Sequence, residues 1–211
     1  MGPRLPYAAI TTAVLLSALA LRIVDPSPVA RLRLLAFDSY QQIAPRPYDP
    51  RLPVRIVDID EESLKRIGQW PWPRDQLAKI VRKLQTLGAA AIGFDLIFAE
   101  TDRQSPEQFA KRLPKRTDTE KLRQLILSLP SYDQDFADAI GSANVVMGFI
   151  AVNEHSETAL PVKAGFATAG DNPKLFTPAY KGVASSLPLL QASAKGIGSL
   201  NWLPRYDQII R

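Results

Sequence analysis

Acidic side chains follow two predicted strands of the chain, at the positions where an α/β sheet most often binds a ligand. Residues 54–59 and 89–98 are rich in β-branched and other apolar residues, which predicts two strands. The acidic residues concerned are Asp58, Asp60 and Glu61 at the end of the first strand, and Asp95 and Glu100 around the end of the second. An amphipathic helix is predicted between the strands, so we expect parallel pairing that brings these carboxylates to one edge of the sheet.

A Trp-Pro-Trp-Pro-Arg sequence between the two strands adds two aromatic rings and a cation, Trp70, Trp72 and Arg74. With the carboxylates, these side chains could form a polar receptor pocket for a small ligand. The carboxylates alone could instead bind Mg²⁺ or Ca²⁺, or divide into an acid and a base. A structural alternative also stands. In it Asp60 caps a helix, Asp95 caps the next turn, Arg74 neutralises one of them, and at least one tryptophan belongs to the core.

The composition removes several classes of function. There are no cysteines, so thiol catalysis, disulfides and cysteine-based zinc sites are excluded. The one histidine, His155, lies in a polar run typical of an exposed loop, whereas a catalytic base needs buried partners. We therefore assign no catalytic residue and no metal ligand and expect no cofactor, with Mg²⁺ or Ca²⁺ as the one metal alternative. The net charge is +5, but the basic run 111–116 lacks aromatics and contains a proline, so we expect a solvated loop and no nucleic-acid partner.

An uncharged apolar run near the N-terminus, residues 5–21, is about long enough to span a bilayer as a helix. We interpret residues 1–24 as a transmembrane anchor or a signal sequence, and a buried core helix is the alternative. Residues 25–53 are predicted to form a helix over 29–43 and then a proline-rich connector. Residues 54–211 would form the main domain, which we expect to be truncated because the chain stops inside a strand pattern at 207–211.

Periodic apolar spacing predicts the remaining elements. Helices are expected over residues 60–67 and 75–87, from Thr117 and from Ser131, with strands over 145–152 and 196–201 and excursion loops over 153–178. Helices alternate with strands, and the run 89–98 is apolar nearly throughout, as in strands that are covered on both faces. The predicted fold is therefore α/β, a mixed, largely parallel sheet flanked by helices and preceded by an N-terminal membrane-spanning helix.

Several of these segments resemble the type-two CHASE domain, a sensory module found outside the membrane in bacterial receptors. The matching elements are residues 57–64, the Gly-Gln-Trp-Pro-Trp-Pro-Arg run at 68–74, Gly88-Ala89 leading to Gly93-Phe94-Asp95, the helix residues 37–40, and the closing elements 198–201 and 207–211. Gln208 stands where the family usually has a glycine. The resemblance implies an extracytoplasmic domain behind one N-terminal helix. It also implies a cytoplasmic output in the parent protein, such as a nucleotide cyclase, a histidine or Ser/Thr kinase, or a diguanylate cyclase.

The sequence thus leads to one hypothesis and two alternatives. The hypothesis is a non-enzymatic sensory domain of a bacterial receptor at the cytoplasmic membrane, facing the periplasm or the cell exterior. Its expected partners are a small-molecule or envelope signal, the lipid membrane and a second copy of the chain. The alternatives are a divalent-metal-dependent hydrolase that uses Asp58, Asp60 and Asp95, and a structural ectodomain that mediates dimerisation.

Overall fold

The computed structural model describes residues 4–202, which form two compact units. The first unit comprises the described residues up to Val57 together with Trp202, and the second runs from Asp58 to Asn201. The expected closing strand at 207–211 lies outside the described residues.

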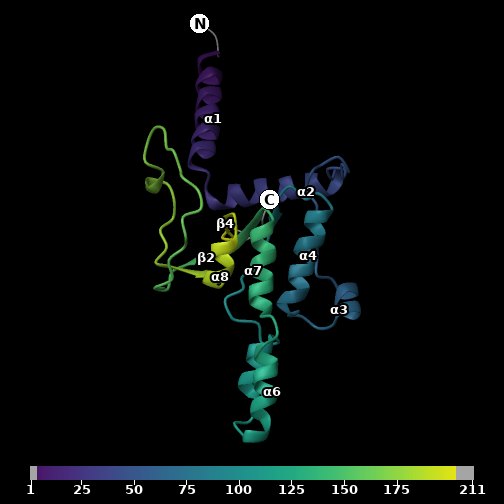
Figure 1. Cartoon of the computed structure of the whole chain (residues 1–211). Helices are drawn as coiled ribbons and strands as arrows, with labels where there is room; N and C mark the ends of the chain where they lie inside the picture. The colour runs from purple at the N-terminus through teal and green to yellow at the C-terminus, as the bar shows by residue number, and fades with distance from the viewer. Residues whose placement is uncertain (1–3, 203–211) are drawn as a thin grey trace. The chain divides into compact units, whose positions relative to one another are not determined.

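The first unit contains two helices and an extended connector (Figure 1). Within the described residues, α1 (Arg4–Val24) is the one helix long and apolar enough to cross a membrane, and none of its Tyr7–Val24 span is buried. That exposure argues against a buried core helix. α2 (Ser27–Ile43) matches the helix predicted over residues 29–43, and residues 44–57 continue without helix or strand.

The second unit holds a mixed sheet centred on β2 (Val145–Val152). β1 (Ile92–Gly93) and β4 (Gly196–Ser199) pair with β2 in parallel, whereas β3 (Gly182–Ser185) pairs with it antiparallel. β1 and β3 occupy successive stretches of one edge of β2, and β4 occupies the other edge. The predicted α/β fold with a largely parallel sheet is therefore confirmed.

A side chain continues the β4 edge beyond the strand. The Asn201 amide oxygen accepts a hydrogen bond from the Ala151 N–H at 2.6 Å, and its amide nitrogen donates to the Ala151 carbonyl at 2.8 Å. The amide thus replaces the next backbone pair of the ladder. Asn201, the last residue of the closing element 198–201, thus takes part in the sheet.

Helices cover one face of the sheet and supply most of the core. α4 (Arg74–Thr86) and α7 (Tyr132–Ser142) lie side by side and pack together (Figure 1). Their apolar sides meet β2 and α8 (Pro188–Ser193) in one cluster. The largest fully buried apolar side chains are Val81, Phe136, Ile140, Val145, Met147 and Leu190. On β2, Val146 and Ile150 alternate with these buried residues and remain exposed.

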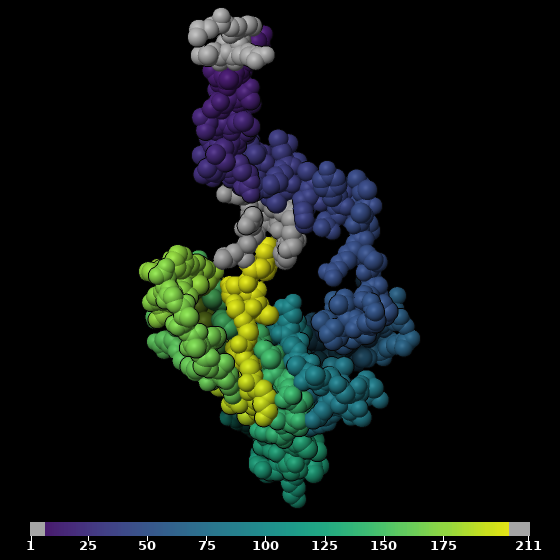
Figure 2. All heavy atoms as spheres, turned by 90° about the horizontal axis from the view of Figure 1, so that it is seen from above, coloured from purple at the N-terminus to yellow at the C-terminus, as the bar shows by residue number. Residues whose placement is uncertain are grey.

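Shorter helices and one long excursion complete the second unit. α3 (Glu61–Ile67) precedes the Trp-Pro-Trp-Pro sequence, and α5 (Pro106–Arg112) packs against α6 (Thr117–Leu127). Residues 153–181 contain only a short 3₁₀ turn, Pro173–Leu175, and form a lobe beside the α8–β4 segment (Figure 2, light green beside yellow). Lys163 attaches this lobe to α8 by donating to the Ala192 carbonyl at 2.8 Å.

The two strands predicted around the acidic residues differ from the structure. Residues 54–59 form no strand, and Ile56 is 91% exposed. Of residues 89–98, only Ile92–Gly93 forms a strand, although the Phe94 N–H also donates to the Val146 carbonyl and the Phe98 carbonyl accepts from the Leu187 N–H. Phe94 and Phe98 pack edge-on against Phe136. Strand preference reflects packing on a neighbouring strand, which a β-branched run alone does not provide.

Two short elements have no strong sequence signal. β3 has four residues and follows a long excursion, and α5 has seven residues within a polar segment for which no element was predicted. The helix predicted from Thr117 begins at that residue, and Arg116 is its N-cap. The Thr119 hydroxyl there accepts from the Arg116 N–H at 3.3 Å.

Candidate functional site

The predicted acidic residues do not gather at one edge of the sheet. Asp60 caps α3, accepting from the Ser63 N–H at 2.8 Å and the Ser63 hydroxyl at 2.7 Å, and these bonds lower the pKa of Asp60. Glu100 forms an exposed ion pair with Arg103 at 2.8 Å. Asp58, Glu61 and Asp95 are exposed.

The convergence that the hydrolase alternative needs is not seen. It requires Asp58, Asp60 and Asp95 to share one ion, yet residues 4–202 contain no group of three or more Asp, Glu or His side chains placed to hold a metal. The three carboxylates were expected to meet because two parallel strands would end beside each other. Residues 54–59 form no strand, so this pairing is absent.

The two tryptophans belong mainly to the interior. Trp72 is buried, and its indole N–H donates to the Gly68 carbonyl at 2.8 Å. Trp70 is half-buried against the core and contacts Trp72 edge-on, with ring centroids 5.7 Å apart. Gly68 has a φ of 115°, a value that favours glycine, and it ends α3 just before the two rings. The Trp-Pro-Trp-Pro-Arg sequence therefore packs on the core, and part of Trp70 remains at the surface.

Arg74 is the first residue of α4, and its side chain is buried inside a polar network. Its backbone N–H donates to Asp102 at 2.7 Å, and its Nη2 donates to the Glu100 carbonyl at 3.1 Å. Its Nε lies 3.5 Å from Oδ1 of Asp133, and the guanidinium carbon lies 4.3 Å from the centroid of the Phe98 ring. One side chain thus contacts the segment 98–102 and the start of α7.

Asp102 and Asp133 are the two buried carboxylates of this network. Asp102 accepts from the N–H groups of Arg74 and Gln104, and its own N–H donates to Asp133 at 3.0 Å. The Asp133 carboxylate thus contacts the guanidinium and the Asp102 carboxylate contacts the Arg74 backbone, so the three residues carry a formal charge of −1. We refer to Arg74, Asp102 and Asp133 as the Arg74 network.

Burial sets the protonation behaviour of the network. It raises the pKa of Asp133, and the neighbouring Asp102 and Glu107 charges act in the same direction against the opposing effects of Arg74 and the Asp102 N–H. Burial also lowers the pKa of Arg74, partly offset by the two aspartates. Arg74 Nε and Asp133 Oδ1 are buried without a hydrogen-bond partner, so their contact is an ion pair of imperfect geometry. The network joins three segments, and all three of its charged residues are buried.

A second polar group extends from the network toward α5. The Ser131 hydroxyl, at the cap of α7, donates to Glu107 at 2.6 Å, and the fully buried Ser105 hydroxyl accepts from the Tyr132 N–H at 3.4 Å. Burial acts to raise the pKa of Glu107, but hydrogen bonds from Ser105 and Ser131 lower it overall. These contacts attach α5 to the beginning of α7.

Sequence reasoning missed Asp102 and Asp133, the partners of Arg74. Asp133 had a signal, because it falls at the i, i+3, i+7 spacing of the apolar stripe that includes Phe136 and Ile140. A carboxylate on a buried face requires a partner. Asp102 had no sequence signal, because it lies in a polar loop and its contact with Arg74 joins residues 28 apart.

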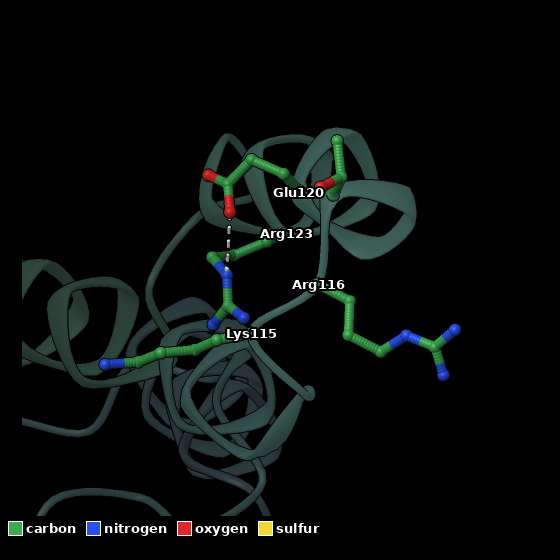
Figure 3. Close-up of a pocket in the computed structure, with 5 residues that line it drawn as sticks. Lys115, Arg116, Glu120 and Arg123 are labelled. Atoms are coloured by element: carbon green, nitrogen blue, oxygen red, sulfur yellow. Dashed lines mark hydrogen bonds and ion pairs between the residues drawn. The ribbon is translucent and has the colours of Figure 1, made fainter.

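The second unit also has a shallow hollow at the turn between α5 and α6 (Figure 3). Its volume is about 540 Å³, and its lining residues are Lys115, Arg116, Thr117, Glu120 and Arg123. Arg123 points into the turn, where it donates to the carbonyls of Ala110, Leu113 and Pro114 and pairs with Glu120 at 3.3 Å. Its donors therefore hold the turn together.

Comparison with known proteins gives one match. The model of the CHASE2 domain matches residues 10–211, which is nearly the whole chain. No curated protein and no solved structure matches it. The family match includes the Trp-Pro-Trp-Pro-Arg sequence and the last residues of the described sheet. The chain therefore belongs to the CHASE2 domain family, a family of extracytoplasmic sensory domains.

Proposed function

We propose that this chain is the ligand-binding sensor domain of a bacterial transmembrane receptor, held on the outer side of the cytoplasmic membrane by α1. Membership of the CHASE2 family supports a sensory role without catalysis. The observation that carries the proposal is α1 itself, an apolar helix of membrane-spanning length in which no residue of the Tyr7–Val24 span is buried. A signal sensed by the second unit would then reach the membrane through the first.

The proposal places ligand contact on exposed groups, because the Arg74 network is closed. Asp58, Glu61 and Asp95 are exposed and Trp70 is partly so, whereas Trp72 and Arg74 would position them from within. A small-molecule or envelope signal would act by binding one of two receptor arrangements more tightly than the other. The cytoplasmic output that we propose for the parent protein is a cyclase, a kinase or a diguanylate cyclase, and the signalling unit that we propose is a homodimer.

Reporter fusions test the location of the domain. Alkaline phosphatase and green fluorescent protein are fused in turn to Arg211, and cells are fractionated. We expect phosphatase activity in the membrane pellet and no fluorescence, because the phosphatase is active only outside the cytoplasm and the fluorescent protein only inside it. Fluorescent cells would refute the proposed orientation. Phosphatase activity released into the soluble fraction would show that residues 1–24 are a cleaved signal.

A pair of arginine substitutions in α1 tests whether this helix spans the membrane. Val14→Arg puts a charge near the middle of α1, where insertion costs about 2.5–3.5 kcal/mol. Val24→Arg puts the same charge at the last residue of the helix, where it reaches the interface. Membrane retention of the phosphatase should fall for Val14→Arg and persist for Val24→Arg. Equal retention of both variants would show that α1 does not span the membrane.

A further inference from the structure

α2 carries an apolar stripe that the described part of the chain leaves uncovered. Leu32, Tyr40 and Ile43 lie on one side of the helix and are 67%, 72% and 79% exposed. Ala30 and Leu34 lie on the other side and are buried and half-buried. A helix of a soluble protein normally packs its apolar side against the protein core. The exposed apolar stripe on α2 therefore indicates contact with an apolar phase or partner outside the described part of the chain.

The chain places α2 beside the end of the candidate membrane span. Only Asp25 and Pro26 separate α1 from α2, and such a link reaches at most about 10 Å. Asp25 has a φ of 43° and accepts two hydrogen bonds from Arg33 of α2, at 2.9 and 2.8 Å. This bidentate pair fixes the corner, and α2 runs across the end of α1 (Figure 1). When α1 spans a bilayer, the first turn of α2 must lie at the bilayer surface.

The charge of this region suits a membrane surface. Residues 22–57 contain six arginines and three aspartates, so the segment around α2 is positive. Arg22 at the end of α1 and Arg31 on α2 are both exposed. Basic residues beside an apolar helical stripe are typical of helices that lie in the interface and meet anionic headgroups.

We propose that α2 is an interfacial helix that lies on the outer leaflet of the membrane. Its apolar stripe enters the boundary between headgroups and acyl chains, Tyr40 takes the interfacial position that aromatic rings favour, and the arginines meet lipid phosphates. This inference rests on the proposed function, because it requires α1 to be inserted. The connector at residues 44–57 would then lead from a fixed point on the membrane to the second unit.

Spin labels on single cysteines test this directly, since the chain has no cysteine of its own. The full chain is labelled at Leu32, Ile43 or Gln41 and reconstituted in vesicles of phosphatidylethanolamine and phosphatidylglycerol. Gln41 is the matched control, because it is exposed on the opposite side of the same helical turn as Ile43. A label at Leu15 in α1 reports insertion of the anchor, and intrinsic tryptophan fluorescence, to which the core residues Trp70 and Trp72 contribute, reports folding. Collision rates with lipid-soluble oxygen and a water-soluble nickel chelate are then compared.

We expect the oxygen-to-nickel collision ratio at Leu32 and Ile43 to be several-fold higher than at Gln41. An equal ratio at Ile43 and Gln41, with the Leu15 label in lipid, would overturn the interfacial helix and leave the anchor intact. Labels at Leu32 and Ile43 that are shielded from both reagents would also overturn it, because a second copy or another part of the chain would then cover the stripe. A Leu15 label accessible to nickel would refute the proposed anchor itself.

Discussion

Replacing Arg74 with methionine keeps most of the aliphatic stem and removes the guanidinium from a buried site. The substitution deletes the ion pair with Asp133, the hydrogen bond to the Glu100 carbonyl and the contact over Phe98. Asp102 and Asp133, which are 7% and 5% exposed, then stay buried with no counter-charge. Removing one partner of a buried pair costs about 3–5 kcal/mol, and we expect Arg74→Met to lower the free energy of unfolding by about that amount.

The measurement is urea unfolding of the full chain in detergent micelles at neutral pH. Tryptophan fluorescence follows the second unit, because Trp70 and Trp72 pack on its core beside Arg74. Arg82→Met is the matched control. Arg82 also lies on α4 and pairs with Asp135 of α7, but its side chain is 45% exposed, so its loss should cost about 0–1 kcal/mol.

A double variant separates the charge effect from simple loss of packing. In Arg74→Met with Asp133→Asn, one uncompensated carboxylate is removed together with the guanidinium. The double variant should therefore be more stable than Arg74→Met alone. Our account of the network is wrong when Arg74→Met costs no more than Arg82→Met, or when the two changes destabilise the protein additively.

Three further predictions concern the second unit. Burial raises the pKa of Asp133 above its ordinary value of 3.8, so the folded state binds the Asp133 proton more tightly than the unfolded state does. This proton binding stabilises the fold fully at pH values below 3.8, and the stabilisation is lost as the pH rises through the folded pKa. The wild type should thus lose stability relative to Asp133→Asn in urea melts taken from acid to neutral pH, and a constant difference would contradict this. Asn201→Ala leaves the Ala151 N–H and carbonyl without partners and should cost about 1–2 kcal/mol in the same melts, whereas no loss would mean that water replaces the amide. In Gly182→Ala the new Cβ would overlap backbone atoms of the facing loop, whereas in Gly165→Ala it meets nothing within 4 Å. Limited proteolysis within residues 153–181 should therefore accelerate for the first variant only, and equal rates would refute the clash.

Helices with local signals could be predicted from the sequence. Asp60 caps α3 and Gly68 ends it, as the residue types indicate, and α4 lies within one residue of its predicted bounds. β2 was predicted over the same residues that form it. Helix caps and periodic apolar faces depend on residues that are close in sequence, so they can be predicted without knowing the tertiary contacts.

The candidate site could not be predicted in the same way, because it depends on pairing between distant segments. The expected acidic cluster assumed that residues 54–59 pair with the strand over 89–98, whereas β1 pairs with β2, a strand more than 50 residues farther along the chain, and residues 54–59 form no strand. Arg74 finds its carboxylates in a loop and a helix start farther along the chain. No spacing rule within the Trp-Pro-Trp-Pro-Arg sequence contains that information.

The interior position of Arg74 and Trp72 changes what the Trp-Pro-Trp-Pro-Arg sequence means. Arg74 joins α4 to the segment 98–102 and to α7, and Trp72 packs in the core. The motif is therefore characteristic of the family because it stabilises the family's fold. Of the predicted carboxylates, Asp95 alone closely follows a strand of the observed sheet, since β1 ends at Gly93. In α/β sheets ligands bind beyond the carboxyl ends of parallel strands. We therefore expect Asp95 to matter more for ligand recognition than Asp60 or Glu100, which already have local partners.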